Sequence, residues 1–323
     1  MSSNPPAEGP PPAPDTVFSS GFLANPDLFP ARRGGEAWGR REIGLALPGG
    51  PYRFAGLNAA QEEAVRRRFG DYCSIVGGAG AAVEVVLFRA AEADFRTFDV
   101  RGWEYGLDLD AAPASLRVAG LRLAGRLDWR PHPPGEVAGA LWTPDAGGAA
   151  FADIFENFLR VVVAYRLHDQ GGAVVHCAAV AGSGGVHLFL GRSGAGKSTI
   201  SRLAQERGGT VLSDDLNALR LEGGVTVVEK LPFTGDYGDS RSVARPAALA
   251  GLYRLEKDTD DALRSLSRAQ GLACLLACSP YVNTDPHRRE ALLANLLRLV
   301  PPGAPVFALR FSLAGGFWPI LER

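Results

Sequence analysis

The most informative part of the sequence is Gly191-Arg192-Ser193-Gly194-Ala195-Gly196-Lys197-Ser198-Thr199. It fits the P-loop (Walker A) pattern of Gly, four residues, Gly, Lys and Ser or Thr, which is reliable when a strand precedes it and a helix follows. Residues 186–190 form an apolar run, and residues 199–207 have helically spaced apolar positions before a glycine pair. Backbone amides and a helix N-terminus would then face phosphate oxygens. The stretch therefore predicts an ATP-binding loop.

Two side chains of this loop suit phosphate chemistry. Lys197 would reach the β- and γ-phosphate oxygens, and Ser198 offers a hydroxyl for a Mg²⁺ ion that bridges them. ATP and Mg²⁺ are the expected cofactors. The loop does not choose among kinases, motors, transport ATPases and switches, because all of them use it.

A pair of carboxylates follows the expected helix. The short apolar run 210–213 reads as a strand that ends in Asp214 and Asp215, on the side where α/β sheets place their sites. One carboxylate can hold the metal while the other takes the proton of an attacking hydroxyl, a division of labour that phosphoryl transfer requires. A strand end and turn with two solvated aspartates is the structural alternative.

The spacing of these landmarks resembles that of the HPr kinase/phosphorylases and the looser set of HPr-kinase-related proteins. His176, on a predicted strand, lies fifteen positions before Gly191, and the Asp pair begins seventeen positions after Lys197. The resemblance implies an α/β P-loop kinase domain of the HPr kinase C-terminal, PEP carboxykinase-like type. It also implies a catalytic set of His176 near the transferred phosphate, Lys197, and Asp214 as the general base. Asp215 would be the magnesium partner, and these two roles could be reversed.

Two features depart from this family. The sequence has no match to the glycine-containing C-terminal signature that the bifunctional enzymes use for dephosphorylation, so phosphorylase activity is not expected. The N-terminal region does not look like theirs either. The nearer likeness is to stand-alone HPr-kinase-like proteins, some of which are associated with peptide-modifying gene clusters. Because the related enzymes assemble, the resemblance leaves a homo-oligomer open.

The chain divides into three segments. Residues 1–15 are rich in proline and poor in large apolar side chains, which predicts a disordered tail. Residues 16–150 alternate apolar and polar positions, as in 82–88 and 116–123, which predicts a smaller β-rich or α+β domain of unknown role. The expected P-loop domain covers 151–323.

Within that last domain the patterns predict several elements. A helix with an apolar stripe is expected from 151 to about 168, followed by paired strands at 173–181 and 186–190. A capping residue and a proline predict a helix that starts near Asp285 and stops at a Pro-Pro-Gly sequence. Residues 305–311 are expected to form the last strand.

Composition narrows the partner classes. A formal charge of −1 gives no basic field for nucleic acid. The sequence has no apolar run of membrane-spanning length and no signal-peptide pattern at its start. Four cysteines lack metal-ligand spacing, so a reducing compartment is expected. These observations predict a cytoplasmic protein without a nucleic-acid or membrane partner.

The patterns together predict an ATP-dependent kinase that transfers the γ-phosphoryl group to a hydroxyl, with Ser of a protein or peptide as the acceptor. A small-molecule kinase is one alternative, and a non-catalytic module that senses ATP is another. The aspartate pair beside an intact loop favours catalysis, because a pure binder needs no base.

Overall fold

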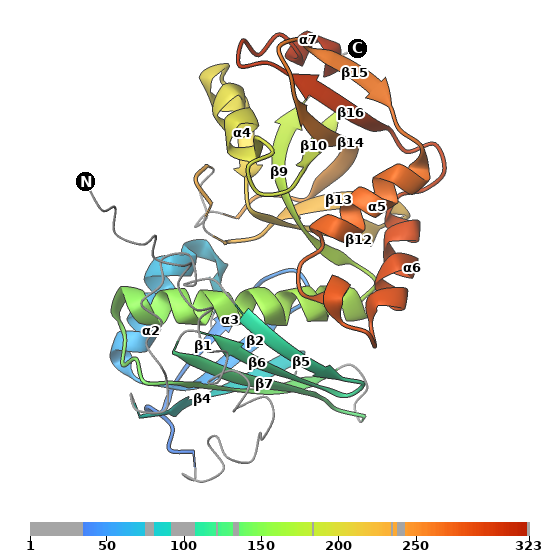
Figure 1. The fold of residues 1–323 in the computed structure, drawn as a ribbon. Helices are drawn as coiled ribbons and strands as arrows, with labels where there is room; N and C mark the ends of the chain where they lie inside the picture. Colours follow the sequence, from blue (N-terminus) through green and yellow to red (C-terminus); the bar gives the residue numbers. More distant parts are fainter. Residues whose placement is uncertain are drawn as a thin grey trace, which may run out of the picture.

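The structure, a computed structural model, describes residues 35–74, 81–91, 107–120, 122–131, 136–182, 184–233, 235–237 and 243–321. These residues form two large β-sheets with helices packed on them (Figure 1). The mixed α/β class expected from the sequence is confirmed. The expected proline-rich tail, 1–15, lies outside the described residues.

The first sheet has the strand order β3-β1-β2-β4-β8-β7-β6-β5. Strand β2 pairs in parallel with β4 and β4 with β8, whereas the other neighbours are antiparallel. Its members are β1 (Arg41–Leu45), β2 (Tyr52–Leu57), β3 (Cys73–Ser74), β4 (Val83–Arg89), β5 (Leu107–Ala112), β6 (Ser115–Gly120), β7 (Leu123–Trp129) and β8 (Val137–Thr143). The stretch 116–123, which was expected to be strand-like, belongs to two strands. A hairpin turn in which Arg122 has a φ of 57° divides it into β6 and β7.

Helix α3 (Gly148–Asp169) confirms the predicted apolar stripe and connects the two sheets. Its Phe155 and Phe158 are fully buried, and the ring of Phe155 lies 4.6 Å from that of Phe54 on β2. The helix packs on the first sheet beside α2 (Ala59–Phe69), and it also contacts β9 of the second sheet. One cluster of buried residues therefore continues from the first sheet into the second. The domain boundary predicted at residue 150 falls at the start of this shared helix.

The second sheet has the order β10-β9-β12-β13-β14-β16-β15, with β11 also on β9. Strand β10 pairs with β14 as well, which closes β10, β9, β12, β13 and β14 into a ring. The predicted pairing of 173–181 with 186–190 is confirmed as β9 with β10. The members are β9 (Ala173–Gly182), β10 (Gly185–Leu190), β11 (Thr210–Ser213), β12 (Leu216–Glu222), β13 (Val225–Lys230), β14 (Ala247–Lys257), β15 (Ala262–Ser265) and β16 (Val306–Phe311).

Helices cover both sides of β9 and β10. On one side α4 (Lys197–Glu206) packs over Val180 and Phe189, and on the other α5 (Arg268–Cys278) and α6 (Arg289–Leu299) lie together (Figure 1). Alternate strand residues enter different cores because neighbouring side chains on a strand point to opposite faces. A last short helix is α7 (Trp318–Leu321). Among the helices of the described residues, none has the length and apolar character needed to cross a membrane.

Arg288 connects the second unit, which is the second sheet with its helices, to the first unit, which is the first sheet with α2. The helix predicted from residue 285 starts only at Arg289, after a turn in which Arg288 pairs with Asp285 at 3.0 Å. The guanidinium of Arg288 donates to the carbonyl oxygens of Ala112 and Pro113, both at 3.1 Å, in the turn between β5 and β6. This buried pair therefore fixes how the C-terminal helices sit on the first sheet.

Candidate active site

The predicted phosphate loop lies between β10 and α4, so the expected strand before it and helix after it are confirmed. Gly194 and Gly196 have φ angles of 77° and 109°, which residues other than glycine rarely adopt. A Cβ atom on Gly196 would also lie 2.5 Å from the ring of Phe311. Because α4 begins at Lys197, its first turn presents backbone amides without helical partners to the loop.

The ammonium group of Lys197 lies inside this loop. The residue is only 7 % exposed, and its Nζ donates to the carbonyl oxygen of Gly191 at 3.1 Å and to that of Arg192 at 3.5 Å. Gly191 and Arg192, both predicted site residues, thus contact Lys197 through their backbone carbonyl groups. The cation is held where the loop backbone converges.

The acidic pair lies at a break between two strands that share a neighbour. Strands β11 and β12 both run antiparallel along β9, β12 beside its first part and β11 beside its second. Asp214 and Asp215 occupy the break, where the carbonyl of Asp215 accepts a hydrogen bond from the amide of Cys177 at 2.9 Å. This pairing puts His176 next to the acidic pair, with its Nε2 atom 3.7 Å from Oδ1 of Asp215.

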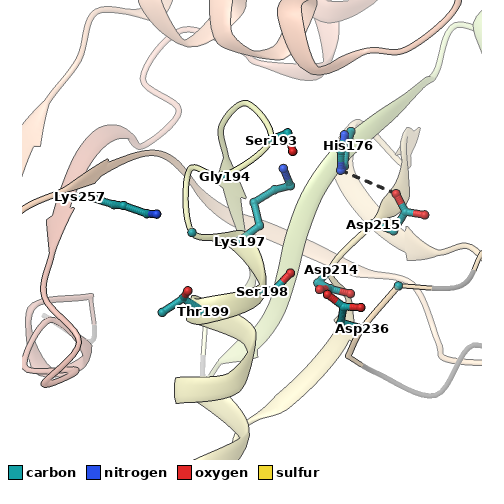
Figure 2. Close-up of a pocket in the computed structure, with 12 residues that line it drawn as sticks. His176, Ser193, Gly194, Lys197, Ser198, Thr199, Asp214, Asp215, Asp236 and Lys257 are labelled. Carbon is teal, nitrogen blue, oxygen red and sulfur yellow. Dashed lines mark ion pairs between the residues drawn. The ribbon is translucent and has the colours of Figure 1, made fainter. Parts of the chain in front are cut away.

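The two carboxylates point in different directions. Figure 2 shows Asp214 beside Asp236 on the side of Ser198, whereas Asp215 is turned toward His176. The first group therefore joins a hydroxyl with two carboxylates, and such hard oxygen donors suit Mg²⁺. In the part of the chain that the structure describes, no three His, Cys, Asp or Glu side chains are arranged to hold a metal by themselves.

Arg160, on α3, is a site residue that the sequence did not predict. Its guanidinium lies 2.8 Å from Oδ2 of Asp215 and 2.7 Å from Oε1 of Glu156, and its side chain is 12 % exposed. Glu156 and Arg160 have the i, i+4 spacing of a helical ion pair, which is visible in the sequence. Nothing along the chain links that pair to a strand end more than fifty residues later.

Burial and neighbouring charges shift two pKa values at this site. Burial raises the pKa of Asp215 above its ordinary value, and the positive charge of Arg160 opposes that rise. Burial, assisted by the cations Lys197 and Arg160, lowers the pKa of His176 to about 4. His176 is therefore neutral at pH 7.

One cavity of about 360 Å³ is lined by all the predicted site residues except three members of the loop, Gly191, Arg192 and Ala195. Two charged residues that were not predicted, Asp236 and Lys257, also line it. Lys257 lies at the end of β14, on the side of the loop away from the acidic pair (Figure 2).

A family model described as "SynChlorMet cassette protein ScmC" matches residues 154–323, which is more than half of the chain. The chain belongs to the ScmC family. The part of this ScmC family member that matches contains the loop, both aspartates and Arg160. No curated protein matched the chain.

Among solved structures, the ScmC family member is similar to one described as "Structure of the Hpr(Ser) kinase/phosphatase from Coxiella burnetii". The identity is 14 % and the TM-score is 0.28, over 46 % of this chain and 91 % of that chain. This likeness is weak, and the HPr kinase type of fold stays a prediction. The function of this ScmC family member is therefore inferred from its site.

Proposed function

We propose that this protein is an ATP-dependent kinase that transfers the γ-phosphoryl group to a hydroxyl, with Ser of a protein or peptide as the acceptor. One observation carries the proposal. The phosphate loop and the acidic pair face the same cavity from two elements, so a nucleotide phosphate and a proton acceptor can meet there.

The loop provides the nucleotide end of the site. Its amides and the first turn of α4 would surround the β- and γ-phosphates. Lys197 would exchange the carbonyl oxygens of Gly191 and Arg192 for phosphate oxygens, which carry more negative charge. Its ammonium would then stabilise the charge on the phosphoryl group in transit.

Ser198 and Asp214 are the proposed magnesium ligands, with Asp236 beside them. Bound Mg²⁺ would neutralise charge on the phosphates. Because the described side chains do not form a complete metal site, these residues would hold the ion together with phosphate oxygens and water. Metal and nucleotide are thus expected to bind together.

Asp215 is the proposed general base. It points away from Ser198, and burial raises its pKa above the ordinary value of a carboxylate, which makes it a stronger base. Asp215 would accept the acceptor's proton as the hydroxyl oxygen bonds to the γ-phosphorus and the bond to the β-phosphate oxygen breaks. His176 lies beside Asp215 and is neutral. It can therefore form a hydrogen bond with the acceptor hydroxyl without forming an ion pair with Asp215. This assignment reverses the aspartate roles expected from the family resemblance.

The test incubates the purified protein with Mg²⁺, γ-labelled ATP and a lysate of its own host, then separates macromolecules from small molecules. Label on a protein or peptide is expected, and it should disappear with Lys197→Ala and with Asp215→Asn. Asp214→Asn should need a higher Mg²⁺ concentration and recover in part when that is supplied. Asp128→Asn, the same change at a half-exposed position on β7 of the first sheet, is the matched control.

Two outcomes would contradict the proposal. Label found only in small molecules would indicate a small-molecule kinase with the same loop. Tight nucleotide binding without transfer to any acceptor would indicate a sensing module.

A further inference from the structure

Arg160 occupies a position that a simple surface ion pair does not need. It is buried beneath the acidic pair, between Asp215 and Glu156, and its guanidinium lies over the ring of Phe233 at 5.4 Å. A planar guanidinium held by two carboxylates and a ring has few other orientations. Arg160 is therefore a fixed donor toward Asp215.

This contact decides which oxygen of Asp215 faces the cavity. Arg160 takes Oδ2, so Oδ1 is left on the side of His176, 3.7 Å from its Nε2 atom. A carboxylate without such a partner can rotate about its side-chain bonds toward another cation. The geometry thus keeps one oxygen of Asp215 directed at the place where an acceptor hydroxyl would lie.

Two lysines, Lys197 and Lys257, line the cavity together with Asp215. Lys197 is the one in the phosphate loop. It lowers the pKa of His176, as Arg160 does, so the two cations act on His176 from opposite elements, the loop and α3. Asp215 is next to His176 and lines the same cavity as Lys197. Without Arg160, the cations that line the cavity with Asp215 are Lys197 and Lys257, and Lys197 is the one whose charge acts on His176 beside Asp215.

Glu156 would keep an ion-pair partner if Arg160 were removed. Its Oε2 atom lies 3.4 Å from Nε of Arg68 on α2. Removing Arg160 would leave Glu156 with that arginine, whereas Asp215 would lose its guanidinium. The chain of contacts from Arg68 through Glu156 and Arg160 ends at Asp215, so it runs from the first unit into the site.

We infer that Arg160 is a positioning residue, which holds Asp215 away from Lys197 so that the base and the phosphate-binding cation stay separate. The inference rests on the proposed function, in which Asp215 is the base. It makes α3, and with it the first sheet, part of the active site. The phosphate loop and the base then work together only while α3 is docked between the sheets.

The first readout is nucleotide binding, which requires no turnover. The affinity for Mg²⁺ with the non-hydrolysable analogue AMP-PNP is measured by calorimetry for the wild type, Arg160→Gln, Asp215→Asn and the double variant. Arg160→Gln should weaken binding roughly tenfold to a hundredfold, because Asp215 then pairs with Lys197. Adding Asp215→Asn should restore the affinity, since an amide does not hold the lysine. Arg166→Gln, on the same helix but bound to Gly49 of the first unit, is the control.

The second readout is turnover with the labelled acceptor. Arg160→Gln should lower kcat by roughly a hundredfold or more at saturating ATP, because the base is misdirected. Arg160→Lys keeps the charge and should recover part of both losses. If Arg160→Gln does not fold, Arg160→Lys with and without Asp215→Asn provides the same comparison.

Two results would overturn the inference while leaving the proposed function intact. One is wild-type affinity and kcat in Arg160→Gln. The other is weakened binding that Asp215→Asn does not restore, which would make Arg160 a purely structural residue. Failure of the wild type to bind AMP-PNP would instead contradict the proposed function.

Discussion

The backbone at Gly235 and Tyr237 lies against one carboxylate oxygen of Asp214. Its Oδ1 atom accepts a hydrogen bond from the amide of Tyr237 at 3.1 Å, and a Cβ atom on Gly235 would lie 2.1 Å from the same oxygen. The segment that contains Gly235 therefore approaches the carboxylate as closely as a chain without a side chain can. This approach fixes the carboxylate on the side of Ser198.

Gly235→Ala should disable the site without unfolding the protein. The added methyl meets the end of a side chain, which can swing away at small cost to the free energy of unfolding. The displaced Asp214 would no longer meet the metal, and phosphoryl transfer should fall about a hundredfold. Transfer rates and urea denaturation measure the two effects. Gly184→Ala, where a Cβ atom would meet nothing within 4 Å, should change neither. Unchanged transfer in Gly235→Ala would show that Asp214 tolerates displacement.

The sequence predicted the site residues that belong to local motifs. Loop glycines, Lys197 and the acidic pair are recognisable because their chemistry depends on neighbours along the chain. Asp236 and Lys257 were missed because they reach the cavity only through tertiary packing. Arg160 was missed because it reaches Asp215 only in the same way. An arginine inside an apolar helical stripe carries no sign of its partner on another element.

At the scale of elements, the joint between the turn before α6 and the first sheet relies on one buried ion pair. The side chain of Asp285 is fully buried and that of Arg288 is 9 % exposed. Arg288 also lies over the ring of Trp129 at 4.2 Å. Burying these charges costs free energy, which the pair and its hydrogen bonds to the β5–β6 turn offset.

Arg288→Met should lower the free energy of unfolding by roughly 3–5 kcal/mol, because it leaves the carboxylate of Asp285 buried without its cation. Urea denaturation measures the loss. Asp285→Asn combined with Arg288→Met should be more stable than Arg288→Met alone, since the unpaired charge is gone. Equal stability of the two variants would mean that the ion pair matters only through the packing of Arg288.

The elements themselves were largely predictable, and the exceptions have local causes. Helical stripes and apolar strands at 151–168, 186–190 and 305–311 correspond to α3, β10 and β16 because their packing follows sequence periodicity. The division of 116–123 was missed because a two-residue turn keeps the alternation of the strands on both sides. The start of α6 was placed too early because Arg288 is used for the joint rather than for the helix.

For the molecule as a whole, the two units share one core, so their docking and their folding are coupled. His168, near the end of α3, lies in this junction and is 6 % exposed. Its Nδ1 atom lies 3.4 Å from the side-chain nitrogen Nδ2 of Asn295 on α6. Burial, and then the charge of Arg288, lower the pKa of His168 to about 4. The junction therefore requires a neutral imidazole.

Acid should weaken this junction between pH 6.5 and pH 4. In that window the unfolded chain binds a proton at His168 and the folded protein does not, so the free energy of unfolding falls as the pH falls. Above pH 6.5 neither state is protonated there, and below pH 4 both are. One such histidine contributes at most about 1.4 kcal/mol per pH unit. His168→Gln should reduce the slope of unfolding free energy against pH, measured by urea denaturation at several pH values.

The comparison variant is His287→Gln, which makes the same change at an exposed position and should keep the wild-type slope. His168→Gln can lower the stability at pH 7 through altered packing, but only its slope tests the proton. A wild-type slope in His168→Gln would mean that the folded protein binds this proton as readily as the unfolded chain. In that case the folded protein would have to open locally at this junction to bind the proton in acid. Exchange of the amide hydrogens near residues 168–172 should then accelerate before global unfolding.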